Sequence, residues 1–241
     1  MPSIEVSGTT DVGLVRQNNE DAFLVDESLS LAIVADGMGG AACGEVASAL
    51  TIEAVTGFLH APAEELEPEM LLKEAIREAN RRVVERADHE PDCNGMGSTI
   101  VAVLWNLPRL VIANVGDSRA YLWRGGELRQ LTYDQTLVNE LRRTLNLTEE
   151  QISSYAHRNV LTMAIGSGND VLIQTRQETL EPGDQILLCS DGLCGVVSDP
   201  DLAQILSRAE PPHVLAENLI AAAKAAHSQD NITAVVLRYS E

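Results

Sequence analysis

The sequence predicts an α+β fold in which two antiparallel sheets lie face to face and helices cover their outer surfaces. Short apolar segments, many with a two-residue period, recur along the chain between Gly, Asp and Pro residues, which is typical of strands. Consecutive segments are joined by tight turns, and this favours antiparallel pairing over alternating strand–helix–strand units. Two pairs of helical segments supply the outer layers.

Nine strands are predicted from the apolar segments. A hairpin turn is expected at Arg124–Glu127, because the paired glycines between them readily adopt positive φ. The predicted strands are Ile4–Thr9, Ala22–Val25, Leu31–Ala35, Thr99–Trp105, Leu110–Val115, Arg119–Trp123, Val171–Glu178, Gln185–Cys189 and Ile232–Arg238.

Four helices are predicted in two pairs, over about 45–59 and 69–87 and over about 199–208 and 213–226. In the second of these, Leu72, Ile76, Ala79 and Val83 fall on one face, as expected of a helix that packs on a sheet. Ser198 or Asp199 is a suitable N-cap for the helix predicted over about 199–208. The segment 134–165 differs from the rest because it is polar and interrupted, and we expect it to form a flap beside the site.

The length and composition fit one globular domain over residues 1–241. Hydrophobic residues make up 45% of the chain and aromatic residues only 3%, so the core must be built from Ala, Leu, Val and Ile. No repeat, low-complexity tract or linker divides the chain. A chain of this length buries a substantial core.

The formal net charge of −19 excludes several function classes. Nucleic-acid binding requires clustered Lys and Arg, and anionic membrane surfaces repel so acidic a protein. No apolar run approaches the roughly 18 residues of a membrane span, and the N-terminal segment lacks the features of a signal peptide. We therefore expect a cytoplasmic monomer. Its cysteines lack CxxC spacing, so we expect buried, reduced thiols at Cys43, Cys93, Cys189 and Cys194.

Five aspartates lie at the ends of predicted core strands. Asp36 and Asp191 each end an apolar run and precede a glycine, and Asp117 follows the run VIANVG. Asp21 comes immediately before the strand AFLV, and Asp230 comes immediately before the strand NITAVV. A single Asp-Gly after a strand is usually a turn. Five such residues together instead predict a cluster at one edge of the sheets.

Aspartate is the residue type expected around a hard divalent cation. Mg²⁺ and Mn²⁺ prefer carboxylate and carbonyl oxygens, whereas several carboxylates without a cation would repel one another and raise their own pKa values. Two ions would remove that repulsion and activate a water molecule. Gly37, which has no Cβ, would let the backbone offer its carbonyl to an ion.

Arg16 lies five residues before Asp21 in the segment VRQNNEDAF. The planar guanidinium binds phosphate through two parallel hydrogen bonds, so an arginine beside a metal centre suits a phosphoryl substrate. Without the neighbouring aspartates, a solvated surface arginine would be the better interpretation.

Six motifs occur in order over about residues 5–238: RQNNEDAF, VADGMGG, MGSTIVAV, VGDSRAY, ILLCSDGL and DNITAVV. Their order and spacing resemble the metal-dependent type 2C serine/threonine protein phosphatases in their compact bacterial form. The resemblance implies an αββα sandwich with two Mn²⁺ or Mg²⁺ ions, and in some members a third, in a cleft between the sheets. It implies that Asp36 bridges both ions, the Gly37 carbonyl binds one, Asp191 and Asp230 bind the first, Asp21 helps to hold the second, and Asp117 helps to hold the weaker third.

The resemblance also implies an activity and partners. A metal-activated bridging water would hydrolyse phosphoserine and phosphothreonine esters, with Arg16 binding the phosphate. Glu20 would contact a metal through water. The implied partners are phosphorylated proteins and a cognate serine/threonine kinase.

The chain departs from the family pattern at several positions. Ala41 stands where bacterial members commonly have a histidine, a candidate general acid, so we expect relatively better turnover of aryl phosphates, whose leaving groups need less protonation. His157 is a possible replacement acid, although a surface histidine is the better interpretation. Tyr133-Asp134-Gln135 replaces Ser-Asp-His, and His227-Ser228 replaces glycines.

Two alternatives remain beside the phosphatase hypothesis. Residues 37–42 fit the dinucleotide-binding pattern GxGxxA, but no second parallel strand ending in an acid follows about 20 residues later. The other alternative is a weakly active or inactive phosphatase fold that serves as a regulatory binding module. The missing histidine favours it, whereas the retained aspartates argue against it.

Overall fold

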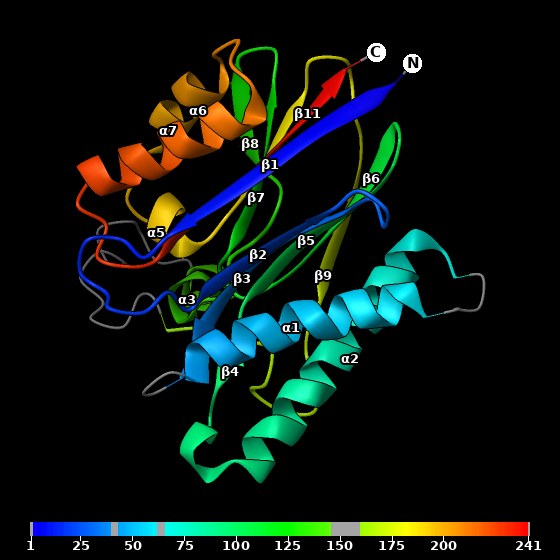
Figure 1. Ribbon diagram of the computed structural model, residues 1–241, viewed down its shortest axis with the longest axis vertical. Coiled ribbons are helices and arrows are strands. Elements are labelled where there is room, and N and C mark those ends of the chain that lie inside the picture. Colours follow the sequence, from blue (N-terminus) through cyan, green and yellow to red (C-terminus); the bar gives the residue numbers. More distant parts are fainter. Residues whose placement is uncertain (1, 40–42, 62–65, 146–159, 241) are drawn as a thin grey trace.

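Two antiparallel sheets form the centre of the computed structural model, which describes residues 2–39, 43–61, 66–145 and 160–240 (Figure 1). The first sheet has the strand order β1 (Ser3–Asp11), β11 (Ile232–Ser240), β10 (Gln185–Cys189), β7 (Arg119–Arg124) and β8 (Glu127–Gln130). The second has the order β2 (Asp21–Asp26), β3 (Leu31–Met38), β5 (Ile100–Asn106), β6 (Arg109–Val115) and β9 (Gln174–Thr179), with β4 (Gly97–Ser98) paired to β3. Every strand pair described is antiparallel.

Helices cover the outer face of each sheet (Figure 1). Helices α1 (Cys43–His60) and α2 (Pro68–His89) lie on the second sheet, and α5 (Asp191–Cys194), α6 (Asp199–Leu206) and α7 (Pro212–Ala225) lie on the first. A short 3₁₀ turn, η2 (Pro91–Cys93), follows α2, and α3 (Leu137–Leu145) lies near one end of the sandwich. The predicted αββα architecture is confirmed.

Side-chain alternation along the strands builds three separate core layers. In β3, Leu31 and Ile33 pack outward in the layer beneath α1 and α2, whereas Ala32 and Val34 pack inward between the sheets. In the same way, the residues of β10 and β11 alternate between the layer beneath α6 and α7 and the layer between the sheets. Because successive side chains point to opposite faces and both faces are buried, the sequences of these strands are apolar at nearly every position.

All nine predicted strands are present, with shifted ends, and so are the four predicted helices. Strand β3 extends through Met38, so Asp36 and Gly37 lie inside the strand and not after it. The predicted hairpin is also confirmed, because Arg124 pairs with Glu127 across two glycines with positive φ. The sequence analysis did not identify β4 and α5, which span only two and four residues, or β8, the return strand of the hairpin.

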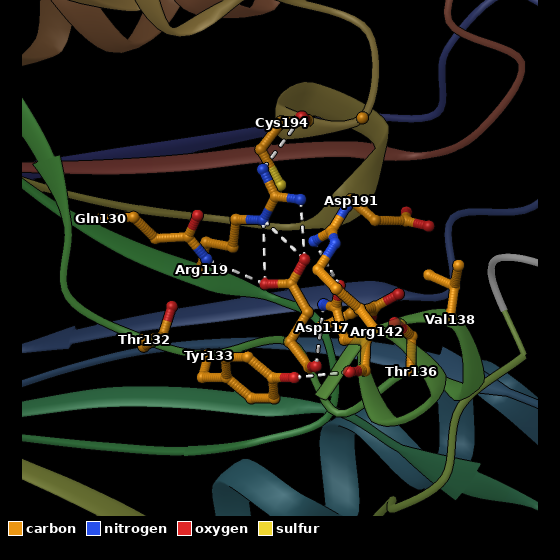
Figure 2. A pocket seen from close by; sticks show the side chains of 13 residues that line it. Asp117, Arg119, Gln130, Thr132, Tyr133, Thr136, Val138, Arg142, Asp191 and Cys194 are labelled. Atoms are coloured by element: carbon orange, nitrogen blue, oxygen red, sulfur yellow. Dashed lines mark hydrogen bonds and ion pairs between the residues drawn. The ribbon is translucent and has the colours of Figure 1, made fainter. Parts of the chain in front are cut away.

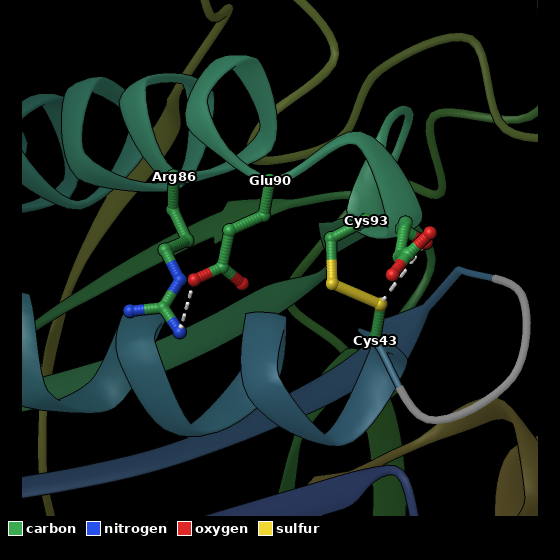
Figure 3. Close-up of a disulfide and its surroundings, with 5 residues drawn as sticks. Cys43, Arg86, Glu90 and Cys93 are labelled. Atoms are coloured by element: carbon green, nitrogen blue, oxygen red, sulfur yellow. Dashed lines mark hydrogen bonds and ion pairs between the residues drawn. A yellow bond between two sulfur atoms is a disulfide. The ribbon is translucent and has the colours of Figure 1, made fainter.

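The prediction of four reduced cysteines is wrong for two of them. Cys43, at the start of α1, forms a disulfide with Cys93 in η2, and their Cα atoms are 5.4 Å apart (Figure 3). Cys189 and Cys194 are buried free thiols, as expected. Fifty positions separate the bonded pair in the sequence, and only the packing of η2 against the start of α1 brings them together.

Among the described residues, no helix is both long and apolar enough to cross a membrane. Of the predicted flap at 134–165, the structure describes α3 and the flanking residues, while 146–159 lie outside the described residues.

Candidate metal centre

A cleft of about 600 Å³ opens at one end of the two sheets, and most of the predicted site residues line it. We call it the acidic cleft. One wall comes from the end of β3 and another from the loop 160–167, while residues of the first sheet complete it. Among the described residues that line it are one basic side chain, Arg16, and the carboxylates Glu20, Asp36, Asp117, Asp191 and Asp230.

Asp21 and Asp36 lie directly opposite each other on the neighbouring strands β2 and β3. Asp21 lies two residues before Phe23, and Asp36 lies two residues after Val34. Both therefore share the inward-facing side of their strands, and both carboxylates point between the sheets. Like charges directly opposite on paired strands destabilise a sheet. This arrangement is therefore tolerable when a proton or a cation neutralises the pair.

Asp21 lies behind the acidic cleft and is not among the residues described as lining it. It is 7% exposed, and the hydroxyls of Ser190 and Thr233 each donate a 2.7 Å hydrogen bond to its Oδ2. Burial raises the pKa of Asp21 to about 7, although these two hydrogen bonds act in the opposite direction. The structure thus places Asp21 as a buried acid supported from the first sheet.

Asp36 reaches the acidic cleft from β3, with its backbone fixed on both sides. The Thr99 hydroxyl accepts a 3.0 Å hydrogen bond from the Asp36 N–H, and the Thr99 N–H donates a 2.8 Å bond to the Asp36 carbonyl. Burial raises the pKa of the Asp36 carboxyl well above its usual range, and the charges of Asp21 and Asp191 raise it further. A bound cation would reverse this effect by favouring the ionised carboxylate.

Asp117, Asp191 and Asp230 complete the acidic wall. Burial, followed by the charge of Asp191, raises the pKa of Asp117 to about 7. Burial also raises the pKa of Asp191, and the neighbouring Asp230 raises it further. These three carboxylates are far apart in the sequence but line one cleft, so the charge of one raises the pKa of its neighbour.

Both Asp-Gly pairs need glycine because the backbone of another segment approaches closely. A Cβ on Gly37 would lie 1.9 Å from the carbonyl oxygen of Gly44 in α1, and a Cβ on Gly192 would lie 1.9 Å from the carbonyl oxygen of Asn231. No side chain fits at either position. For Gly37, the close approach of α1 is therefore a reason for the missing side chain beside the ion contact that the sequence predicts.

Arg16 lies at the open side of the acidic cleft, and its side chain is 49% exposed. Its Nη2 donates a 2.8 Å hydrogen bond to Oδ2 of Asp230. This bond raises the pKa of the guanidinium, so Arg16 stays charged. One nitrogen of the guanidinium thus contacts the Asp230 carboxylate, and the side chain borders a cleft large enough for a phosphate.

The chemistry of this wall fits divalent cations. Half-buried, mutually repelling carboxylates from both sheets supply the oxygen ligands that Mg²⁺ and Mn²⁺ prefer. Within the described part of the chain, no three Asp, Glu, His or Cys side chains already converge as a closed ligand sphere. Such ions retain several water ligands, so a more open ring of carboxylates is compatible with them.

Hydroxyl and amide groups that the sequence analysis did not single out support the acids. Where the inward-facing apolar positions end, they give way to a polar layer of Asp21, Asp36, Thr99, Asn114, Ser118, Ser190 and Thr233. Asn231 also accepts a hydrogen bond from the backbone of Glu20 and donates to the carbonyls of Val12 and Asn18. The change from apolar to polar at alternate positions near one end of each strand was a visible sequence signal.

The departures at 133–135 have structural roles beside the site. Asp134 makes a two-pronged ion pair with Arg119, with the shortest N–O distance at 2.7 Å. The Gln135 side chain accepts a 2.7 Å hydrogen bond from the Gly116 N–H and donates a 2.8 Å bond to the Leu172 carbonyl. Gln135 therefore holds the turn that presents Asp117.

The departures at 227 and 228 lie beside Asp230. His227 has a φ of +57°, which explains why glycine is favoured at this position. The buried Ser228 hydroxyl donates a 2.8 Å hydrogen bond to the Gly192 carbonyl and so links this turn to α5.

Three further residues were considered in the sequence analysis. Glu20 lines the acidic cleft, and burial raises the pKa of its carboxyl. Ala41, where the family commonly has a histidine, and His157, the possible replacement acid, both lie outside the described residues.

Several known proteins are similar to this chain in sequence and in fold. The family model described as protein phosphatase 2C matches residues 14–224. The serine/threonine phosphatase stp of Listeria monocytogenes is 37% identical over 238 residues, which cover 95% of this chain and 93% of that protein. Two solved structures are also similar. The catalytic domain of the phosphatase PstP, in complex with two manganese ions, has a TM-score of 0.88 and 34% identity over the whole of both chains.

The second structure, Staphylococcus aureus Stp1, has a TM-score of 0.90 and 32% identity over 98% of this chain and 95% of that one. The antiparallel topology also excludes the parallel strand–helix–strand unit of a dinucleotide-binding fold within the described residues. Since the family match spans most of the chain and the relatives cover nearly all of it, the chain belongs to the protein phosphatase 2C family.

Proposed function

We propose that this chain is a Mn²⁺- or Mg²⁺-dependent phosphoprotein phosphatase that hydrolyses phosphoserine and phosphothreonine monoesters. The observation that carries the proposal is the acidic cleft, in which carboxylates from both sheets meet one arginine. This combination of acids, which attract divalent ions, with a guanidinium, which binds phosphoryl oxygens, suits a phosphate ester.

Four aspartates and one carbonyl would hold two ions in the core site, with a candidate third position beside Asp117: Asp36, Asp117, Asp191, Asp230 and the Gly37 carbonyl. Asp21 would act from behind, through its position opposite Asp36. When bound, the ions supply an activated water for attack on phosphorus and positive charge for the phosphoryl oxygens. The Ser190 hydroxyl orients Asp21, and the Thr99 hydroxyl fixes the backbone of Asp36, so these two acids are positioned before substrate arrives.

Arg16 would bind two phosphoryl oxygens through its planar fork. Its present partner, Asp230, is one of the acids proposed to bind an ion, so the same carboxylate would orient Arg16 toward the metal centre. Positive charge at this position stabilises the charge that builds up on the phosphoryl oxygens during transfer.

The first test compares Arg16→Ala with Arg77→Ala on an aryl phosphate in Mn²⁺. Arg77 is a matched control, because it is 52% exposed and pairs with an acid on α2, away from the acidic cleft. Loss of charge-assisted hydrogen bonds of about 1.5–3 kcal/mol predicts a roughly 10- to 100-fold higher KM for Arg16→Ala. An unchanged KM would remove Arg16 from the site.

The second candidate, a phosphatase fold that serves only as a binding module, is favoured by Ala41 alone. Titration of Mn²⁺ and Mg²⁺ against an aryl phosphate separates the two. A pure binding module gives no metal-dependent turnover, whereas the proposed enzyme gives turnover that saturates with metal and disappears in Asp36→Ala.

Several finer features belong to the same proposal. The segment 134–165 would act as a flap of a single catalytic domain over residues 1–241. A cognate serine/threonine kinase, a monomeric state and a cytoplasmic location stay predictions from the sequence.

A further inference from the structure

A closed ring of contacts surrounds the backbone of Gly37, whose carbonyl is proposed to bind a metal ion. On one side, Gly37 pairs with Ser98 of β4. On the other side, it packs against the start of α1, where the carbonyl oxygen of Gly44 leaves no room for a Cβ on Gly37. The Cys43–Cys93 disulfide joins these two sides, because Cys43 is the first residue of α1 and Cys93 lies just before β4 (Figure 3). One covalent bond therefore closes the ring beside the acidic cleft.

The segment formed by η2 and β4 is attached to two walls of the acidic cleft. Gly97 of β4 pairs with Met38 of β3, which lines the cleft. Ser98 and Ile165 exchange two backbone hydrogen bonds of 3.0 and 2.8 Å, and Ile165 belongs to the loop that forms another wall. A shift of the η2–β4 segment would therefore move the backbone on both sides of the proposed metal centre.

The disulfide lies close to the protein surface. Cys43 and Cys93 are each 8% exposed. Cys93 is the buried residue of the short turn η2, and its neighbours Pro91, Asp92 and Asn94 are exposed. Short exposed segments open locally without unfolding of the whole protein. Such an opening of η2 gives a small thiol access to the sulfur atoms.

The other two cysteines are placed differently and are free thiols. Cys189 is completely buried. Cys194 borders a pocket of about 430 Å³ that also contains Asp117 and Asp191 (Figure 2), and its thiol donates a 3.4 Å hydrogen bond to the Ser190 carbonyl. Because neither is bonded to another cysteine, reduction leaves both unchanged. Only the Cys43–Cys93 pair responds to a reductant.

We propose that the Cys43–Cys93 disulfide is a reversible redox site that sets the affinity of the acidic cleft for divalent ions. This inference rests on the proposed function. The reductant is a dithiol, which acts in two exchanges. Its first thiolate attacks one sulfur atom and breaks the S–S bond, and its second thiolate then displaces that protein sulfur as the dithiol closes into its own disulfide. The two protein thiolates released in this way take up protons.

The direction of the effect follows from the ring around Gly37. In the oxidised protein, the disulfide fixes η2 and β4 against α1, whereas in the reduced protein only noncovalent contacts do so. A metal ion then has to order ligands that the oxidised protein holds in place, and this ordering costs free energy. Reduction should therefore weaken Mn²⁺ binding by roughly 10-fold, as loss of groups that orient metal ligands commonly does.

The test titrates Mn²⁺ into the oxidised full chain and into protein reduced with dithiothreitol, from which the reductant has been removed without air. Isothermal titration calorimetry gives the dissociation constant, at a temperature at which circular dichroism shows both forms folded. Reduction should raise the count of free thiols from two to four. It should raise the dissociation constant roughly 10-fold. The rate on an aryl phosphate should fall at low Mn²⁺ and recover at saturating Mn²⁺.

The double variant Cys43→Ser, Cys93→Ser is the matched control. It keeps both free thiols, so it should bind Mn²⁺ with the weaker affinity before and after the same treatment. Equal Mn²⁺ affinities of the oxidised and reduced protein, or a double variant that binds as tightly as the oxidised protein, would overturn the inference and leave the proposed function intact. Absence of Mn²⁺ binding in both forms would instead overturn the proposed function and, with it, this inference.

Discussion

At the scale of single residues, the acids of the site oppose folding in the absence of metal. The buried Asp21 faces the half-buried Asp36 across two paired strands, a position that an apolar pair would stabilise. The hydroxyls of Ser190 and Thr233 offset only part of that cost, since the pKa of Asp21 still rises to about 7. Functional sites commonly reduce stability in this way.

Asp21→Asn should change the pH dependence of stability in the metal-free protein. A carboxyl whose pKa rises from its ordinary value of 3.8 to about 7 on folding binds its proton more tightly in the folded state. The protonated carboxyl therefore makes its full contribution to folding stability at pH values below its pKa in the unfolded chain. That contribution is lost as the pH rises toward 7. Between about pH 5 and about pH 7.5, the variant should gain on the order of 2 kcal/mol relative to the unmodified protein.

Urea unfolding in EDTA at the two pH values measures this gain. Asp26→Asn, at the other end of β2, is the control. Hydrogen bonds from Ser28 lower the pKa of the Asp26 carboxyl, so this group does not titrate in that range. An Asp21→Asn variant whose stability differs from the unmodified protein by the same amount at both pH values would contradict the prediction.

At the scale of elements, the Cys43–Cys93 disulfide ties the start of α1 to the segment that enters β4. Strand β4 pairs with Gly37 and Met38 of β3, so the disulfide lies beside the backbone that borders the acidic cleft. Figure 3 shows the bond between the first turn of α1 and η2. It closes a loop of 50 residues that contains both α1 and α2.

Replacing both cysteines by serine should lower the free energy of unfolding by roughly 2–4 kcal/mol, because the unfolded chain loses a cross-link. Urea unfolding with and without dithiothreitol measures the effect. The reductant should destabilise the unmodified protein and leave the double variant unchanged. Equal unfolding midpoints for the unmodified protein with and without dithiothreitol would show that the disulfide does not contribute to the free energy of unfolding.

At the scale of the whole molecule, the proposed metal centre would join the two sheets. Asp36 belongs to β3 of the second sheet, whereas Asp191 and Asp230 flank β10 and β11 of the first. Ions held by these acids would bind only the folded sandwich, since the unfolded chain does not bring the acids together. Binding of this kind stabilises by mass action.

Manganese should therefore raise the melting temperature, and EDTA should reverse the change. Metal at about 100 times its Kd stabilises the folded state by about 2.7 kcal/mol. For a domain of this size, that raises the melting temperature by roughly 5–10 °C. Asp36→Asn should melt higher than the unmodified protein in EDTA, because one of the mutually repelling carboxylates is gone, and should respond little to manganese. A variant that responds fully to manganese would exclude Asp36 as a metal ligand.

The sequence by itself determined nine of the strands, the four helices that cover the sheets in pairs, and the acids. Period-two alternation and turn residues are local properties, so segments such as Leu31–Ala35 and Gln185–Cys189 could be located without any partner. The αββα layers followed from the way these elements succeed one another. The order of the six motifs indicated the family.

Only the tertiary structure decided which residues meet. The strand register set Asp21 opposite Asp36, the packing of η2 joined Cys43 to Cys93, and the approach of α1 explained Gly37. It also showed that Thr99, Ser190 and Thr233, which lie in other strands or directly next to their ends, support the acids. The physical reason is that alternation and propensity act over a few residues, whereas register, disulfide pairing and close backbone approach depend on contacts between segments far apart in the chain.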